Sequence, residues 1–239
     1  MAEYDSIAKE YEKATVREFR KFCYDPLLEK HIGNLEGKRV LDLACGEGFS
    51  SRFMKKLGAN EIIGLDISSE LIEIAKKKDS ENIQYFVGDA INYDFSVLGK
   101  FDVITAIMLF DYVSSKEDFL KILKKINSVL NEDGEFYFLN PNPKTQLNYN
   151  SYGVKQVAES DKEGSKVIVT LGDFYGKKHC TFTTYYWKNE TIQNLFKEAR
   201  FDFELLPSII AKEGIEKYGK AFWKEYQETP MYIMIKAKK

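Results

Sequence analysis

The stretch LDLACGEGFSS, Leu41 to Ser51, begins as a short apolar run and ends in two closely spaced glycines followed by small polar residues. An apolar run that stops at glycines predicts a buried strand and a tight loop. A helix is predicted after the loop, because Phe49, Phe53 and Leu57 would share one helical face. A loop of this kind lets the backbone approach a ligand, and the helix N-terminus favours an anion. Because a dinucleotide-binding loop would place a third glycine at Ser51, the pattern alone does not decide the ligand.

The same unit of strand and helix recurs along the chain. Further strands are predicted at Glu61 to Asp66, Ile83 to Asp89, Phe101 to Ile107 and Glu135 to Asn140. This alternation predicts an α/β fold whose parallel sheet is covered by helices on both faces. After Pro143 the run SKVIVTLGDFYGKKHCTFTTYYW predicts an antiparallel hairpin that turns around Gly172 to Lys178, and MYIMIKA predicts a final strand.

Composition limits the classes of function. The chain has 239 residues, enough for a single domain, and its net charge of −2 gives no general attraction to nucleic acid. The 3 cysteines are far apart and suggest neither a disulfide framework nor a metal site. The first residues, MAEYDSIAKEYEKA, have no apolar core for a signal peptide, and no apolar run is long enough to span a membrane. We therefore expect a cytoplasmic protein, a monomer by default, that acts on a small molecule.

Three carboxylates stand at or near predicted strand ends. Asp42 lies inside the first strand, Asp66 closes the second and Asp89 closes the third. In parallel sheets ligands bind outside the carboxyl ends of the strands, where an acid about 20 residues past the glycine loop accepts hydrogen bonds from ribose hydroxyls. We expect Asp66 in that role and Asp89 with Ala90 at an adenine edge; the alternatives are a helix cap for Asp66 and an exposed turn for Asp89.

Together, the motif DLACGEG, the acids Asp66 and Asp89, and FDVITAIMLFDYV in the fourth strand resemble class I S-adenosylmethionine-dependent methyltransferases. The resemblance covers Tyr4 to Asn140 and departs at Ala44, where the family has its first glycine. It implies a Rossmann-like, doubly wound, mostly parallel seven-stranded sheet with an antiparallel C-terminal strand, to which the hairpin is an insertion. Glu47, between the glycines, would repel a pyrophosphate more than the zwitterionic tail of this methyl donor.

The resemblance also implies how the chain is divided and which residues bind the donor. Residues 1–36 would form a helical lid, 37–140 the donor-binding core, and 141–239 the substrate side of one domain. Arg20 would bind the carboxylate of the donor. The residues expected at S-adenosylmethionine, whose product is S-adenosylhomocysteine, are Tyr4, Tyr11, Arg20, Ala44, Cys45, Gly46, Gly48, Phe49, Asp66, Ile67, Asp89, Ala90, Ala106 and Leu109.

A closer resemblance is to the small-molecule N-methyltransferases related to toxoflavin synthase, through YDSIAKEY, LACGEGF, the hairpin ending in TTYYW, and the C-terminal tail. It implies methylation of a ring nitrogen of a flat heterocycle, although Asp111 departs from that group's pattern after the fourth strand. The run Asn140 to Pro143 is not the motif of nucleic-acid amino methylases, because that motif follows strand four. The residues expected around the substrate are Asp111, Tyr112, Asn140, Tyr152, Tyr185, Tyr186 and Trp223.

Neither histidine lies in a strand-end motif. We expect His31 to end a helix and His179 to lie in the hairpin turn, so the chemistry is expected to rely on proximity and exclusion of water, with no metal and no certain catalytic residue. Three alternatives remain: O-methylation of a phenol or hydroxyl, a non-catalytic protein that binds the donor, and an NAD-dependent oxidoreductase sharing the glycine loop and Asp66.

Overall fold

The computed structural model describes residues 19–79, 82–172 and 177–239. Its main sheet has seven strands in the order β10-β11-β5-β4-β1-β2-β3, and β11 is the strand that runs antiparallel to its neighbours. The fold predicted from the sequence is therefore confirmed. The strands of this sheet are β1 (Arg39–Leu43), β2 (Glu61–Asp66), β3 (Gln84–Val87), β4 (Phe101–Ile107), β5 (Leu130–Pro141), β10 (Asp202–Leu206) and β11 (Tyr232–Lys238).

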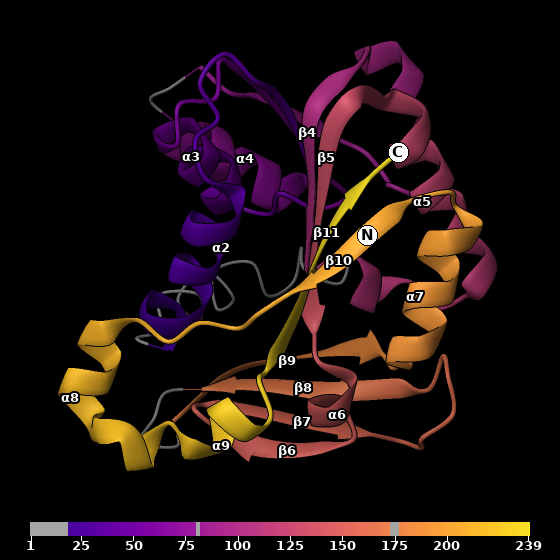
Figure 1. Cartoon of the computed structure of the whole chain (residues 1–239). Helices are drawn as coiled ribbons and strands as arrows, with labels where there is room; N and C mark the ends of the chain where they lie inside the picture. The colour runs from indigo at the N-terminus through magenta and orange to yellow at the C-terminus, as the bar shows by residue number, and fades with distance from the viewer. Residues whose placement is uncertain (1–18, 80–81, 173–176) are drawn as a thin grey trace.

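Helices cover both faces of the main sheet (Figure 1). One face carries α2 (Asp25–Ile32), α3 (Phe49–Lys56) and α4 (Ser69–Lys78), and the other carries α5 (Lys116–Val129) and α7 (Asn189–Glu198). Along β5, Phe136 and Phe138 pack into the core on the α5 side, whereas Tyr137 and Leu139 pack into the core on the α2 side. Because both sides of each central strand are buried, the strands are continuous apolar runs in the sequence.

The insertion is a second, four-stranded antiparallel sheet in the order β6-β7-β8-β9. Its strands are β6 (Asn148–Ser151), β7 (Val154–Ala158), β8 (Lys166–Gly172) and β9 (Lys178–Tyr185). The predicted hairpin is β8 paired with β9, and β6 and β7 extend it. In Figure 1 this sheet crosses below the main sheet, close to α9.

The remaining helical segments of the described residues are mostly short. They are η2 (Arg20–Tyr24, a π-helix), η3 (Phe95–Leu98), η4 (Phe110–Tyr112), α6 (Pro143–Gln146), α8 (Lys212–Phe222) and α9 (Lys224–Glu228). His31 lies in the last turn of α2, as expected. His179 does not lie in the hairpin turn: it is inside β9, at the irregularity between Lys178, which pairs with Gly172, and Cys180, which pairs with Leu171.

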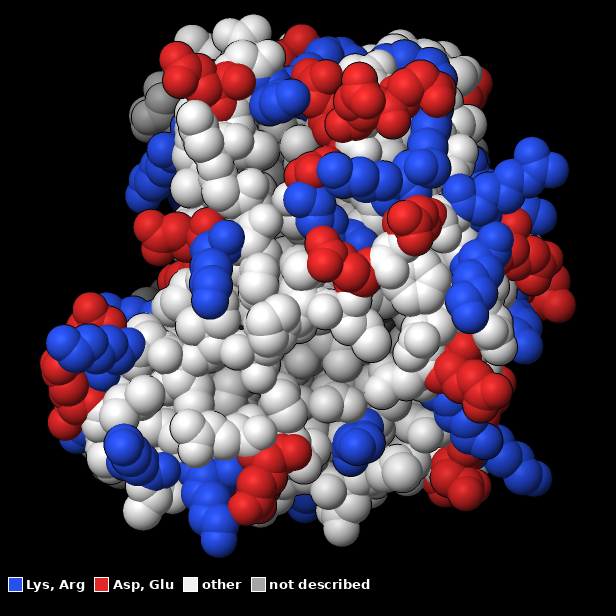
Figure 2. Space-filling model, in the orientation of Figure 1, with Lys and Arg blue, Asp and Glu red and all other residues white. Residues whose placement is uncertain are grey.

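Among the described residues, no helix is both long and apolar enough to cross a membrane. The same part of the chain holds no group of His, Cys, Asp or Glu side chains that could bind a metal ion. On the face shown in Figure 2, acidic and basic side chains are interspersed at the top and along the edges, and the centre is largely uncharged. This face therefore presents no extended single-sign patch of the kind that binds a nucleic-acid backbone.

Candidate active site

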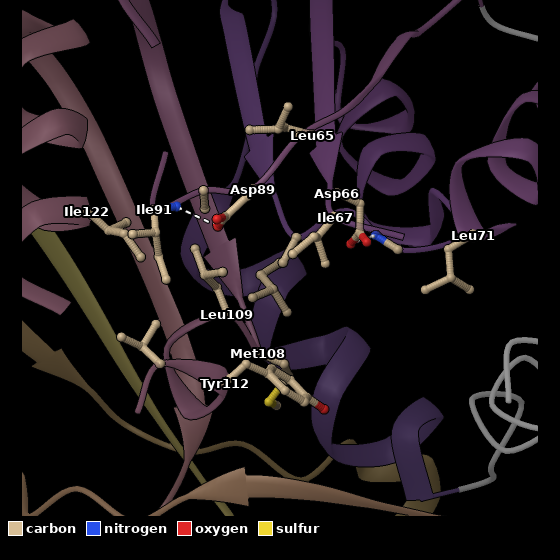
Figure 3. A pocket seen from close by; sticks show the side chains of 16 residues that line it. Leu65, Asp66, Ile67, Leu71, Asp89, Ile91, Met108, Leu109, Tyr112 and Ile122 are labelled. Atoms are coloured by element: carbon tan, nitrogen blue, oxygen red, sulfur yellow. Dashed lines mark hydrogen bonds between the residues drawn. The ribbon is translucent and has the colours of Figure 1, made fainter. Parts of the chain in front are cut away.

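A first pocket opens at the carboxyl ends of β1, β2, β3 and β4 (Figure 3). Its volume is about 230 Å³. Asp66 and Asp89 lie on one side of it, and Met108 and Tyr112 lie across from them. Of the residues predicted to bind the methyl donor, those that line this pocket are Ala44, Gly46, Asp66, Ile67, Asp89, Ala90 and Leu109.

Hydrogen bonds to the carboxylate of Asp42 hold the loop that connects β1 to α3. This fully buried carboxylate accepts hydrogen bonds from the hydroxyls of Ser50 at 2.7 Å and Ser51 at 2.6 Å through Oδ2, and from Thr105 at 2.8 Å through Oδ1. Burial raises the pKa of Asp42, while the three hydroxyl donors oppose that rise. Ser51 thus stands where a third glycine would be because its hydroxyl ties the start of α3 to β1.

Left-handed backbone geometry bends this loop toward the pocket. Ala44, Gly46 and Gly48 have φ of 56°, 54° and 81°. Nothing lies within 4 Å of where a Cβ on Gly46 would be, so the pocket reaches its backbone. Glu47 instead points to Arg52 at 2.8 Å and Lys78 at 3.0 Å. These two cations offset the charge of Glu47, and its expected repulsion of a pyrophosphate stays a prediction.

Asp66 is held in place by two backbone donors. Its Oδ2 accepts from the Gly46 N–H and its Oδ1 from the Ser68 N–H, both at 2.8 Å. The cap of α4 is Ser68, whose Oγ accepts from the Leu71 N–H at 3.2 Å, so Asp66 is not the helix cap. Each carboxylate oxygen can accept more than one hydrogen bond, so this geometry leaves Asp66 able to accept from a hydroxyl in the pocket.

Asp89 lies in the turn after β3. It accepts hydrogen bonds within this turn and also lines the first pocket. Its Oδ1 accepts from the Ile91 N–H at 2.8 Å, the bond drawn in Figure 3, and its Oδ2 accepts from the Asn92 side chain at 2.7 Å. These bonds fix the turn that brings Ala90 and Ile91 to the pocket.

A second pocket adjoins the first and shares Met108 and Tyr112 with it. It lies between the main sheet and the small sheet, with Val154, Val169 and Phe182 on its small-sheet side. Of the predicted residues, Asp111, Tyr112 and Arg20 line it. Met108 has φ of 56°, and its N–H donates to the Leu139 carbonyl at 2.7 Å, so the chain turns sharply where the two pockets meet.

Asp111 is the charged group buried most deeply at the second pocket. Its side chain is 3% exposed, and burial raises the pKa of its carboxyl to about 7. Asn140 lies behind it: with its amide oriented to satisfy both neighbours, the Asn140 oxygen accepts from the Asp111 N–H at 2.9 Å and its nitrogen donates to the Leu139 carbonyl at 3.0 Å. Asn140 therefore supports the backbone of η4 and does not line either pocket.

Arg20 lines the second pocket and not the first. Its guanidinium stacks on Phe49, 3.4 Å from the ring centre, and its Nε donates to Asp25 at 3.2 Å. This stacking on α3, the helix that follows the glycine loop, places the positive charge beside the donor-binding core.

Other predicted residues lie elsewhere. Tyr4 and Tyr11 are outside the described residues. Trp223 and Tyr152 stack on each other at 5.5 Å inside the core beneath the small sheet. The described residues that were predicted at the site and line neither pocket are Cys45, Gly48, Phe49, Ala106, Asn140, Tyr152, Tyr185, Tyr186 and Trp223.

Sequence reasoning missed several residues that line the pockets. Leu71 and Ile122 are helix residues whose apolar character marks only a core position, and Gln156 belongs to β7, a strand that was not predicted. Met108 could have been suspected, because it follows the fourth strand at the edge where ligands bind.

Comparison with known proteins agrees with this geometry. A family model described as a methyltransferase domain matches residues 40–134. A demethylmenaquinone methyltransferase of Lactococcus lactis is 29% identical over 216 residues, which are 83% of this chain and 80% of that protein. A ubiquinone biosynthesis O-methyltransferase of Actinobacillus pleuropneumoniae is 33% identical over 46% of this chain and 49% of its own length.

A solved structure gives the same fold. The S-adenosylmethionine-dependent methyltransferase from Clostridium acetobutylicum superposes with a TM-score of 0.65 at 19% identity and covers 98% of both chains. Residues 40–134 therefore form a methyltransferase domain with S-adenosylmethionine as its methyl donor, and the chain has the fold of solved S-adenosylmethionine-dependent methyltransferases. The alternatives of an NAD-dependent oxidoreductase and of a non-catalytic binding protein are set aside.

Proposed function

We propose that the chain transfers a methyl group from S-adenosylmethionine in the first pocket to a ring nitrogen of a small, flat heterocycle in the second pocket. The observation that carries this proposal is the contact between the pockets, which share Met108 and Tyr112. A donor and an acceptor that meet at these residues can be aligned for in-line displacement, and alignment supplies much of the rate enhancement in such a reaction.

The residues of the first pocket fit the donor. Asp66, 8% exposed and anchored by two backbone N–H groups, would accept hydrogen bonds from ribose hydroxyls. Asp89 and Ala90 would face the adenine, and the open backbone at Gly46 would admit the amino-acid tail. Arg20 remains a candidate for the donor carboxylate from its place on Phe49. When bound, S-adenosylmethionine supplies a methyl group on a positively charged sulfur.

The second pocket supports a flat acceptor. Its walls are mainly apolar and aromatic, with Tyr112 and Phe182 6.2 Å apart between ring centres on one side, and they include the polar residues Arg20, Asp111 and Gln156. Its volume of about 100 Å³ is small beside that of the first pocket, which argues against a macromolecular substrate. A narrow apolar pocket of this kind excludes water from the reacting atoms.

An oxygen acceptor is the second candidate. The relative from Actinobacillus pleuropneumoniae is named an O-methyltransferase, and Asp111 lies in the second pocket, where an acid could receive a hydroxyl proton. A nitrogen acceptor is favoured by the resemblance to the toxoflavin-synthase group.

The proposal keeps the reaction in the cytoplasm and within one chain. Cys23 and Cys45 are buried thiols that form no disulfide, which suits a reducing compartment. A monomer would be sufficient, with the donor held by residues 37–140 and the acceptor pocket lined by residues of 141–239 together with Arg20, Asp111 and Tyr112.

Calorimetric titration with S-adenosylhomocysteine tests the donor site. We expect Asp66→Ala to weaken binding at least about tenfold, because a hydrogen bond to a charged group contributes on the order of 1.4 kcal/mol or more. Glu70→Ala, an exposed carboxylate in the first turn of α4, is the matched control and should bind like the wild type. Equal affinity of Asp66→Ala and wild type would remove Asp66 from the site.

A further inference from the structure

Asp111 carries a buried oxygen that the donor site does not use. No described residue donates a hydrogen bond to its Oδ1, and the side chain lies in η4, one residue before Tyr112, at the wall of the second pocket. Leaving a buried carboxylate oxygen without a donor costs free energy, so such a group is typical of a site where a ligand provides the donor.

Gln156, in the small sheet, also carries a buried oxygen to which no described residue donates a hydrogen bond. It is 2% exposed, its Nε2 donates to the Thr145 hydroxyl at 3.3 Å, and no described residue donates to its Oε1. It lines the same pocket as Asp111. Two buried oxygens without a described donor, one from η4 and one from β7, therefore belong to residues that line one small cavity, and a purely apolar molecule would leave both unsatisfied.

The charges around Asp111 are few. Arg20 is the cation among the described residues of this pocket, and its guanidinium is already stacked on Phe49 and bonded to Asp25. The other titratable side chains of the pocket wall are Tyr24, Tyr112 and Tyr232. No described cation forms an ion pair with Asp111, so burial dominates and raises its pKa to about 7. A carboxyl group with a pKa near neutrality can both accept and release a proton under working conditions.

We propose that Asp111 accepts a hydrogen bond from the N–H or O–H group to be methylated and then takes its proton, while Gln156 Oε1 accepts from a second donor on the same edge of the substrate. This inference rests on the proposed function. The lone pair of the acceptor atom forms the bond to the methyl carbon, the carbon–sulfur bond breaks with its electron pair left on sulfur, and the acceptor's proton passes to Asp111. The substrate class is then a flat molecule with two adjacent hydrogen-bond donors.

Binding of simple probes tests this recognition without knowledge of the natural substrate. Two pairs are compared by calorimetry, with and without S-adenosylhomocysteine: 2-aminobenzimidazole against 1,2-dimethylbenzimidazole, and catechol against 1,2-dimethoxybenzene. We expect the donor-bearing member of at least one pair to bind about tenfold tighter than the member that has no N–H or O–H group. A preference in the first pair indicates that the group to be methylated is an N–H group. A preference in the second pair indicates that it is an O–H group.

The variant Asp111→Asn, which keeps the size of the side chain and removes its basicity, should reduce this preference to less than about threefold. Its affinity for S-adenosylhomocysteine should stay that of the wild type, since Asp111 does not line the first pocket. Asp133→Asn removes an exposed carboxylate outside both pockets and should change nothing. The inference fails if the wild type shows no preference in either pair, or if the preference survives in Asp111→Asn.

Turnover provides a second, independent readout. With an acceptor found by mass-based screening, Asp111→Asn should lower kcat by about 100-fold or more and alter KM less, because a base acts in the transition state. The wild-type kcat/KM should rise with pH through about 7, as the Asp111 carboxyl loses its proton, and this limb should be absent in the variant. An unchanged pH profile would overturn the inference, whereas a wild-type chain that does not bind S-adenosylhomocysteine would contradict the proposed function instead.

Discussion

Ala44 has a left-handed backbone conformation, with φ of 56°, in the loop that connects β1 to α3. For a residue with a Cβ this conformation costs about 1–2 kcal/mol, and glycine adopts it without that penalty. The family pattern has glycine at this position, so the departure seen in the sequence coincides with backbone strain at the wall of the first pocket. The surrounding hydrogen bonds of Asp42, which fix the loop from below, keep Ala44 in this conformation.

Replacing Ala44 by glycine should stabilise the protein. We expect Ala44→Gly to raise the free energy of unfolding by about 0.5–1 kcal/mol, because relief of the left-handed strain exceeds the added entropy of the unfolded chain. Urea denaturation measures this change. Ala75→Gly, at a buried position inside α4, is the control and should lower the free energy of unfolding by about 1 kcal/mol. A loss of stability in Ala44→Gly would show that its methyl group contributes more by packing than its backbone costs.

The sequence locates the acids of the first pocket because strand ends can be read from apolar runs. Asp66 and Asp89 follow such runs, and parallel strands bring them to one edge. The role of Asp42 could not be read in the same way, since its three hydroxyl partners come from two separate segments. The aromatic residues assigned to the substrate, Trp223 among them, were identified by type alone, and aromatic type does not distinguish a pocket wall from a core.

At the scale of elements, the small sheet illustrates what periodicity misses. Strands β8 and β9 were predictable from long alternating runs, and they pair as expected. Strand β6 has the sequence NYNS, with Tyr149 as its buried side chain, and carries too little hydrophobic pattern to indicate a strand. Its pairing with β7 depends on tertiary packing, and no local sequence pattern indicates that Gln156 of β7 lines a pocket.

The end of the small sheet is attached to η4 through Trp187. Its Nε1 donates to the Val113 carbonyl at 2.8 Å, and its ring packs edge-on against Phe119 of α5 at 5.8 Å. We expect Trp187→Phe to lower the free energy of unfolding by about 1–3 kcal/mol, because the Val113 carbonyl loses its indole donor in a buried site. Tyr186→Phe, which removes a neighbouring hydroxyl that bonds to no described residue, should stay within about 0.5 kcal/mol of wild type in the same urea titration. Equal effects of the two variants would contradict this role of the indole N–H.

At the scale of the whole molecule, the two sheets share a hydrophobic cluster and a junction of hydrogen bonds. The cluster joins Phe19 and Phe22, at the start of the described chain, to the small sheet and to Met231 before β11. At the end of β5 the Asn142 N–H donates to the Met231 carbonyl at 2.7 Å, and its side chain donates to the Pro230 carbonyl at 2.8 Å. A unit joined in this way should unfold as one cooperative body.

A ligand of the first pocket should therefore stabilise the distant small sheet as well. At 100 times its dissociation constant, S-adenosylhomocysteine should raise the free energy of unfolding by about 2.7 kcal/mol.

The variant Trp187→Phe leaves Trp223 as the one tryptophan, since the chain has 2, and Trp223 reports on the cluster beneath the small sheet. Its fluorescence transition should coincide with the transition in circular dichroism and shift by the same amount with ligand. Adding Asp66→Ala should reduce the shift at the same ligand concentration to about 1.4 kcal/mol or less, because binding is at least about tenfold weaker. Two separated transitions, of which only one responds to ligand, would show that the sheets unfold independently and that the acceptor side is not coupled to the donor side.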